Sequence, residues 1–343
     1  MTTFNKPAVT VDEHLALLQG RGLCVNDTHQ ARHVLETVSF FRLSIYMRPF
    51  QVVGKENHSF KSGTDFNQIL DLYAFDRELR LLVMDAIETV EVALRASLNN
   101  HMSCTYQIDS EPHSGSHWYL HRNRFKEKYN YAKLIRDIET KQQYEGRHLD
   151  KEKRKINASR APSQTKQQRI GHRSKDNYPR FYQHNYQTPA LMPGWAMTEE
   201  LSLGNLSHMY KGLLKDADRK AIARRFNVPH EVLGSWLHTL TFVRNCCAHH
   251  SRLWNRELPV QPKILQGEDW QFRKLMPDSQ IRPSRRIYVV LILLAHLIRQ
   301  ISPHSQWPLN VKSLVRMYPN VHLAPMGFTC DWQSHIFWSG ADA

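Results

Sequence analysis

The feature that most constrains the fold is one long amphipathic stretch over residues 66–98. Apolar residues recur there every three or four positions, which is the period of one helix face. The members of this stripe are Phe66, Ile69, Leu70, Tyr73, Leu79, Val83, Ala86, Ile87, Val90, Leu94 and Leu98. The stretch predicts a single helix of unusual length with one continuous apolar side.

The other side of the same stretch carries two pairs of opposite charge, Asp76 with Arg80 and Glu91 with Arg95. The members of each pair lie four residues apart, so their side chains are neighbours on a helix surface. We therefore expect both pairs on the solvent-facing side of this helix.

Helical periods recur over most of the remaining chain, whereas alternating strand patterns are scarce. Further helices are expected over 28–47, 198–214, 216–226, from Val232 into 242–256, and over 284–301. Pro259 cannot continue the helix that starts at Val232. The residues expected in the core include Phe40, Phe41, Tyr46, Phe50, Trp236, Leu237, Leu240 and Val243. The sequence predicts an all-α fold.

The formal net charge of +14 predicts attraction to polyanions, of which nucleic acid is the commonest. Residues 141–180 hold twelve Lys and Arg against four Asp and Glu, so this segment alone contributes +8. Large aliphatic residues are nearly absent from it, and such a composition cannot bury a core. It predicts either a mobile insertion or a helix with a solvated basic surface. In functional terms it is either a solubilising linker or an RNA-binding arm.

Several protein classes are disfavoured by the composition. The longest apolar run, 287–298, has twelve residues and is too short to span a bilayer, so no membrane association is expected. Five cysteines at no repeating spacing favour free thiols in a reducing compartment, and with no apolar targeting region near the start we expect a cytoplasmic protein. Motifs for nucleotide, metal or serine-nucleophile chemistry are absent, so neither a metal nor a cofactor is expected.

The stretch 242–256 reads FVRNCCAHHSRLWNR and is unusually polar for the end of a packing helix. Metal-independent RNA cleavage needs a group that exchanges protons near neutral pH and a cation that holds the phosphorane charge. Histidine meets the first requirement and the arginine fork meets the second, so His249 and Arg244 are the candidate catalytic residues. Asn245 would hold the phosphate or orient the imidazole.

The spacing of Arg244 and His249 is by itself a weak signal. Two other pairs have it, Arg225 with His230 and Arg299 with His304, but each has a proline just before the histidine. Only residues 244–249 fall within a plausible unbroken helix. Five helical steps place the two side chains about 140° apart, so one copy makes a lopsided site. Two copies related by a twofold axis would surround one groove, and we expect a homodimer.

Several sequence blocks resemble the AbiD/AbiF-like abortive-infection proteins, a branch of the HEPN superfamily. FVRNCCAHHSRLWNR resembles their signature, and FNQILDLYAFDRELRLLVMDAIETVEVALRASL resembles their central helix. KPAVTVDEHLALLQGRGL, VSFFRLSIYMRPF, PGWAMTEELSLGNLSHMYKGL and MGFTCDWQSHIFW also match in the family's order. The last block departs from the pattern, because Thr329 and Cys330 stand where a proline and an acidic residue are expected.

This resemblance implies a HEPN-type helical bundle, here with a basic insertion, and an Arg-x4-His motif at Arg244 and His249. It also implies a toxin-like ribonuclease that acts in phage defence. Further RNA-binding residues are expected at His250, Arg252, Asn255 and Arg256, and in the insertion at Lys151, Lys153, Arg154, Lys155, Arg169 and Arg173. Sites of this type sometimes place an acidic residue near the motif arginine, for which Glu88 and Glu91 are candidates. A surface pair with Arg95 is the simpler interpretation of Glu91.

The expected organisation has an N-terminal helical segment over 1–60, a first part of the HEPN core over 61–140, the basic insertion over 141–180 and a second part of the core over 181–343. The expected function is an endoribonuclease that leaves 2′,3′-cyclic phosphates. One alternative is a non-catalytic protein that holds a structured non-coding RNA in a ribonucleoprotein. Another is a regulatory helical module that acts through protein partners.

Overall fold

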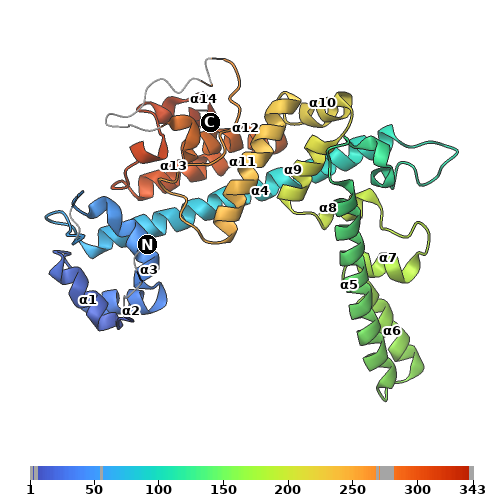
Figure 1. The fold of residues 1–343 in the computed structure, drawn as a ribbon, viewed down its shortest axis with the longest axis horizontal. Coiled ribbons are helices and arrows are strands. Elements are labelled where there is room, and N and C mark those ends of the chain that lie inside the picture. Colours follow the sequence, from blue (N-terminus) through green and yellow to red (C-terminus); the bar gives the residue numbers. More distant parts are fainter. Residues whose placement is uncertain (1–2, 4–6, 55–56, 268–269, 271–281, 340–343) are drawn as a thin grey trace.

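The computed structural model describes residues 3, 7–54, 57–267, 270 and 282–339. Over these residues it consists of α-helices, short 3-10 helices and loops, with isolated β-bridges but no strand (Figure 1). The prediction of an all-α fold is confirmed. No helix in the described ranges is both long enough and apolar enough to cross a membrane.

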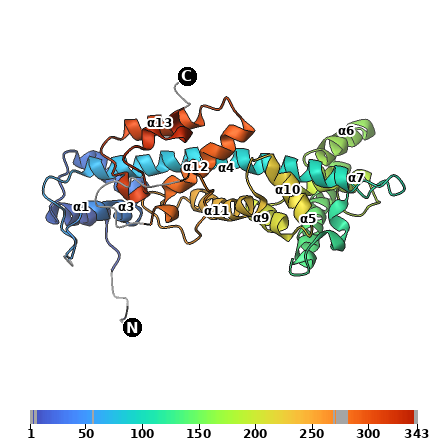
Figure 2. The same cartoon turned by 90° about the horizontal axis from the view of Figure 1, so that it is seen from above.

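Helix α4, Phe66–Thr105, is 40 residues long and forms the axis of the molecule (Figures 1 and 2). It begins with a capping box, in which Asp65 accepts from backbone N–H groups of the first turn and Gln68 accepts from the Asp65 N–H. The predicted stripe is buried at nearly every position from Phe66 to Leu98. The expected long helix is confirmed, and it extends seven residues beyond the predicted end at Leu98.

Among the described residues seven helices pack against α4. They are α3 (Phe40–Met47), α8 (Gly194–Glu199), α9 (Leu203–Gly212), α10 (Asp216–Arg224), α11 (His230–Ala248), α12 (Ile287–Ile301) and α13 (Trp307–Met317). The helix expected over 198–214 is in fact two helices, because the chain turns at Glu200–Ser202 and Ser202 caps α9. Trp236, Leu237, Leu240 and Val243 of α11 are buried in the core as predicted. The last helix of the described residues, α14 (Ile336–Ser339), lies beside α12 and α13.

The N-terminal region forms α1 (Val11–Gly20), α2 (Thr28–Thr37) and α3 (Phe40–Met47) at one end of α4 (Figure 2). A single helix over 28–47 is therefore wrong. Ser39 has a φ of 72°, which no helix can contain, and its side chain instead caps α3. The core prediction also fails for Phe41, which is 88% exposed, whereas Tyr46 is buried.

The basic segment is helical and projects from the other end of α4. We call α5 (Tyr131–Ala158), α6 (Ser163–Ser174) and α7 (Tyr178–Asn185) the arm (Figure 1). Of the two predicted alternatives, the helical one with a solvated basic surface is the one observed. The expected boundary between residues 140 and 141 falls inside α5, so the arm is a continuation of a helix that begins at the core.

Candidate functional site

The motif residues lie at the C-terminal end of α11. Arg244 and Asn245 belong to its last turn, and His249 is the C-cap residue, with its N–H donating to the Asn245 carbonyl over 3.0 Å. The expected unbroken helix through 249 is thus one residue too long. Arg244 is half-buried, whereas the side chains of Asn245 and His249 are exposed. The imidazole is accessible from solvent, as a proton-transferring group must be.

A tight reversal follows the motif. His250 has a φ of 53°, and its N–H donates to the Cys247 carbonyl over 3.0 Å. The Ser251 N–H then donates to the Cys246 carbonyl over 2.8 Å, which satisfies carbonyls that the end of a helix leaves unpaired. The helix end is therefore closed by its own backbone.

Asp76 of α4 fixes the loop that follows this reversal. The carboxylate is fully buried and accepts from the backbone N–H groups of Leu253 over 3.0 Å and Trp254 over 2.5 Å. It also accepts from the Tyr46 hydroxyl over 2.6 Å and forms an ion pair with Arg80. The prediction that the Asp76–Arg80 pair faces solvent is wrong, because the motif loop covers it. A buried charge is tolerated here because each of these groups satisfies it.

Arg42 of α3 holds the same loop from a second direction. Its guanidinium donates to the His250 carbonyl over 2.7 Å. Sequence reasoning missed Arg42, and it noted Asp76 and Arg80 only as a surface pair. Periodicity carries no sign of these contacts, because the residues that meet lie far apart in the sequence.

Three arginines gather around the loop. Arg252 is half-buried, and burial lowers the pKa of its guanidinium, with the nearby charges of Arg256 and Arg48 acting in the same direction. The buried Nε atom of Arg252 has no hydrogen-bond partner among the described residues. The Arg256 Nε donates to the backbone carbonyl of Arg252 over 2.6 Å, which holds the Arg256 side chain against the loop backbone at Arg252. The predicted RNA-binding residues Arg252 and Arg256 thus lie close together, and Arg48 is an addition that the sequence did not indicate.

The other predicted residues of this stretch have different surroundings. Asn255 has a φ of 47°, and its side-chain oxygen accepts from Arg286 over 3.1 Å. That contact anchors the loop to the segment just before α12. The His250 side chain is exposed.

Arg244 lines a pocket of about 250 Å³ between α11 and α4. The other lining residues are Met84, Ile87, Glu88, Glu91, Val92 and Arg95. Glu91 pairs with Arg95 over 2.5 Å, and Arg95 also donates to the Leu201 carbonyl. The pairing agrees with the simpler interpretation of Glu91, but the expected solvent-facing position is wrong, because the side chains of Glu91 and Arg95 are only 13% and 15% exposed. Arg244 itself forms no ion pair or side-chain hydrogen bond with any described residue. Its fork therefore remains available to a ligand.

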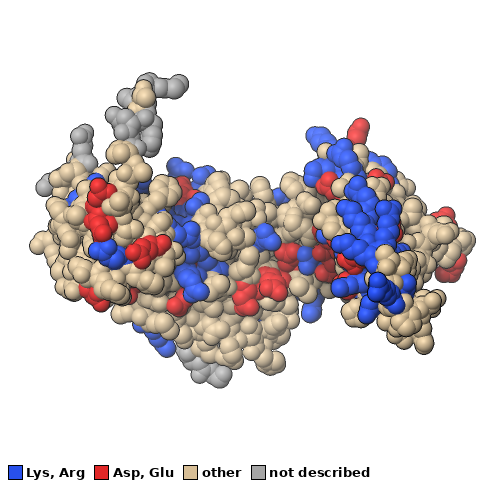
Figure 3. All heavy atoms as spheres, turned by 90° about the horizontal axis from the view of Figure 1, so that it is seen from below, with Lys and Arg blue, Asp and Glu red and all other residues tan. Residues whose placement is uncertain are grey.

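The predicted cations of the arm lie on its surface. Lys151, Arg154, Lys155 and Arg169 are exposed and form no ion pair within the described part of the chain. Figure 3 shows Lys and Arg gathered as a stripe over this end of the molecule. Unpaired exposed cations of one sign attract a polyanion.

Two predicted arm residues are instead engaged within the arm. Lys153 is half-buried, with its ammonium 3.2 Å from the Nδ1 atom of His184 and 3.7 Å from Asp150. Arg173 lies 3.4 Å from Asp176 and 3.7 Å from Glu152. We regard these two as residues that hold the arm together.

The motif and the arm are separate in space, but both lie on the same side of α4. Helix α11 crosses α4, and its C-terminal end lies on the side toward which the arm projects (Figure 1). A ligand that contacts both must be long, since α5 alone extends about 42 Å at 1.5 Å per residue. In the described ranges no three His, Cys, Asp or Glu side chains come together as metal ligands do.

Comparisons with known proteins give one result. A family model described as Abi-like protein matches residues 33–255, which run from α2 to the loop after α11 and include the motif and the arm. Neither the curated proteins nor the solved structures contain a match. The matched segment is well over half of the chain, so the protein belongs to the Abi-like family, which points to a role in abortive-infection defence against phage.

Proposed function

We propose that this protein is a metal-independent endoribonuclease of the HEPN type that acts in abortive infection. The observation that carries the proposal is the accessibility of the Arg244 and His249 side chains to a ligand. The arginine has no internal ion pair among the described residues, and the histidine is exposed at the end of α11. The loop behind them is held by the buried Asp76 carboxylate and by Arg42. Such a fixed arrangement is what positioning of a reacting phosphate requires.

In the proposed reaction His249 accepts the proton of a ribose 2′-hydroxyl, whose oxygen attacks the adjacent phosphorus. The bond from phosphorus to the 5′-oxygen breaks, and that oxygen leaves with a proton supplied by a second acid. The products are a 2′,3′-cyclic phosphate and a 5′-hydroxyl. Arg244 and Asn245 would stabilise the negative charge that develops on the phosphorane oxygens.

The arginine cluster would bind the phosphates that flank the cut. Arg252 and Arg256 were expected to contact RNA, and Arg48 lies close enough to them to influence the pKa of Arg252. Three cations in one place repel each other, and a bound phosphate group would relieve that repulsion. Exposed His250 would contact RNA beside them.

The test is cleavage of RNA by purified protein in the presence of a chelator. Wild type is compared with His249→Ala, Arg244→Ala and His33→Ala, an exposed histidine of α2 that serves as the matched control. Loss of His249 is expected to slow cleavage about 10²–10⁴-fold, while His33→Ala leaves it unchanged. RNA fragments must carry 2′,3′-cyclic phosphate ends. Equal cleavage by wild type and His249→Ala would contradict the proposal.

The exposed cations of the arm favour a second candidate, a non-catalytic protein that holds a structured RNA. Lys151, Arg154, Lys155 and Arg169 would then bind phosphates along a stem far from the motif. The check is whether the protein, purified from cells that carry its native locus, brings a discrete RNA with it. A discrete RNA together with no cleavage by the free protein would favour this candidate over the nuclease.

A further inference from the structure

Phe41 is a large aromatic side chain that the fold leaves in solvent. It is 88% exposed, and no other phenylalanine in the described part of the chain is exposed to this degree. Leu43 and Tyr46 are buried against the core, so α3 packs on one face and Phe41 lies on the opposite one. Single exposed apolar residues are common, so exposure by itself assigns no role. The surroundings of Phe41 are more informative.

Helix α3 is tied to the motif loop on both sides of Phe41 in the helix turn. Arg42, the next residue, donates to the carbonyl of His250, which directly follows the motif histidine. Tyr46 donates to Asp76, the carboxylate that holds the rest of the loop. Since both contacts would have to break for α3 to move away, the Phe41 ring has a fixed place beside the motif.

Phe41 also shares a helix side with one member of the arginine cluster. Arg48 continues α3 with helical angles, φ −51° and ψ −42°, and seven helical residues are close to two full turns. Arg48 is exposed, and its charge adds to burial and to the charge of Arg256 in lowering the pKa of Arg252. The ring and the cations are therefore about 10 Å apart along the helix and face the same solvent.

An exposed ring beside several cations suits single-stranded RNA. The phosphates of such a strand pair with arginines, and its unpaired bases stack on aromatic rings. Bases inside a duplex already stack on each other and present no free face to a side chain. A protein partner would need a wider apolar patch, and on α3 Phe41 is the one large apolar side chain that is exposed.

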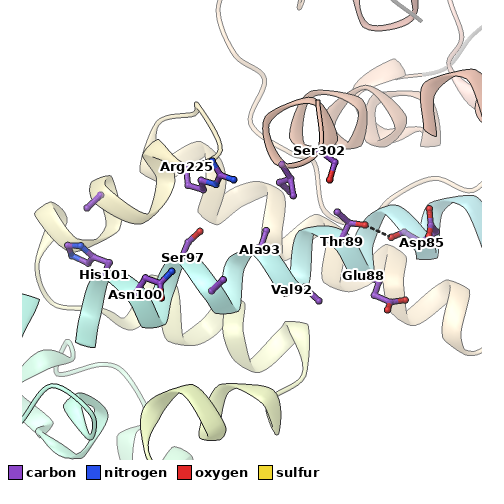
Figure 4. Close-up of a pocket in the computed structure, with 13 residues that line it drawn as sticks. Asp85, Glu88, Thr89, Val92, Ala93, Ser97, Asn100, His101, Arg225 and Ser302 are labelled. Atoms are coloured by element: carbon purple, nitrogen blue, oxygen red, sulfur yellow. Dashed lines mark hydrogen bonds between the residues drawn. The ribbon is translucent and has the colours of Figure 1, made fainter. Parts of the chain in front are cut away.

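The groove along α4 lacks this combination. It has a volume of about 890 Å³ and runs from Asp85 to His101. Figure 4 shows small side chains, Ala93 and Ser97 among them, between these two ends. None of the described residues that line it is a phenylalanine, tyrosine or tryptophan, and Asp85 and Glu88 would repel phosphates. An unpaired base has no ring to stack on there.

We propose that Phe41 is the stacking platform for an unpaired base of a single-stranded RNA whose phosphates are bound by Arg48 and Arg252. The proposal deepens the proposed nuclease function and rests on it for the identity of the ligand. A base held on Phe41 fixes the strand relative to the motif. One phosphodiester bond, at a constant distance from that base, is then presented to His249.

The test compares the binding of two strands of equal length and charge. One is a short oligouridine, and the other is its abasic analogue, which keeps the sugar-phosphate chain but lacks the bases. Every 2′-oxygen is methylated, so neither strand can be cut. Wild type is expected to prefer the oligouridine, and Phe41→Ala to reduce that preference by at least about fivefold. The phosphate contacts of the arm cancel in this ratio.

Two further variants serve as controls. Phe41→Tyr keeps an aromatic ring and should keep the preference. Trp195→Ala removes a side chain that is 48% exposed in α8, whose Thr198 accepts from Asn99 near the far end of α4 from Asp76. It should leave the preference unchanged. A circular dichroism melt confirms that each variant folds.

Ultraviolet cross-linking of an oligouridine that carries 4-thiouridine locates the bound base. Cross-links are expected on residues 40–47 of wild type. Absence of binding, a preference that Phe41→Ala leaves unchanged, or cross-links confined to other segments would overturn the proposal, and the exposed ring would then serve a protein partner. Cleavage of the unmethylated strand is scored separately. Stacking without cleavage refutes the nuclease but not the platform, and cleavage without stacking does the reverse.

Discussion

The region around the motif and the arm are stabilised by different interactions. Around the motif, α4, α11 and α12 bury large apolar side chains almost completely, and the buried Asp76 carboxylate accepts hydrogen bonds from Tyr46, Leu253 and Trp254. The arm has a thin apolar interior of Leu134, Ile138, Leu149 and Tyr182. The arm also buries the polar side chains of Gln142, Glu145 and Ser174.

A charged network performs in the arm the role that packing performs in the core. The Glu145 carboxylate accepts from Arg180 over 2.8 Å and from the Asn177 amide over 2.9 Å, and Arg180 also lies 3.4–3.5 Å from Asp176 and Glu152. The comparison shows that one chain can fix a short loop by tight packing and also support a large basic surface on helices with a small apolar core. The following experiments test this difference.

The largest effect is expected at Asp76. Asp76→Ala leaves Arg80 buried without its partner and leaves the N–H groups of Leu253 and Trp254 unsatisfied. We expect a loss of about 3–5 kcal/mol in the free energy of unfolding, measured by urea denaturation. The control is Glu36→Ala, an exposed carboxylate of α2, with a change within about 0.5 kcal/mol. Similar stabilities for the two variants would show that the motif loop does not depend on this carboxylate.

A smaller and local effect is expected in the arm. Arg180→Ala removes the partner of Glu145, and both side chains are 11% exposed, so about 1–3 kcal/mol of local stability should be lost. Hydrogen exchange should accelerate in α6 and α7 and stay unchanged in α11. Arg136→Ala, which changes an exposed arginine of α5, is the control. Equal acceleration in α11 would mean that the arm and the core unfold as one unit.

The two regions should also respond to acid at different pH. Burial lowers the pKa of His296, which contacts the Phe226 carbonyl in the core. In the unfolded chain a histidine has a pKa near 6.5, so it takes up a proton below that pH, whereas His296 in the folded core stays neutral to a lower pH. The free energy of unfolding should therefore fall as the pH drops below 6.5. Denaturation of wild type and His296→Gln at two pH values on either side of 6.5 measures this, and the variant should lose part of the pH dependence.

The arm network should survive to lower pH. Burial alone would raise the pKa of Glu145, but hydrogen bonds from Asn177 and Arg180 outweigh it and the pKa lies below its usual 4.5. The network therefore contributes stability that is fully present above pH 4.5 and is lost as pH falls through the lowered pKa. Exchange in α7 that accelerates already near pH 6 would contradict this order.

The smallest effect on stability is expected from neutralising the surface of the arm. Lys151→Gln, Arg154→Gln and Lys155→Gln should each change the free energy of unfolding by less than about 0.5 kcal/mol, because these side chains are exposed. Affinity for RNA should nevertheless fall, and the slope of log affinity against log salt should decrease by about one per lost phosphate contact. An unchanged slope would mean that the stripe does not bind RNA.

Much of the fold and part of the site follow from local features of the sequence. The length of α4, the buried face of α11 and the basic surface of the arm are consequences of period and composition, which act over a few neighbouring residues. The position of Arg244 and His249 at the end of α11 likewise follows from the sequence of neighbouring residues. The breaks at Ser39 and at Glu200–Ser202 were missed, because a capping serine can interrupt a helix without disturbing the apolar period.

The sequence by itself determined the helical architecture, the motif and where the positive charge lies. The tertiary structure decided which polar residues are buried, which arginines join the site and which aromatic side chain lies exposed beside them. Asp76 looks like one half of a surface pair until Leu253, 177 residues away in the chain, packs onto it and donates its N–H. Periodicity shows only on which face of its own helix a side chain lies. What covers that face depends on contacts between distant segments, and no local pattern encodes them.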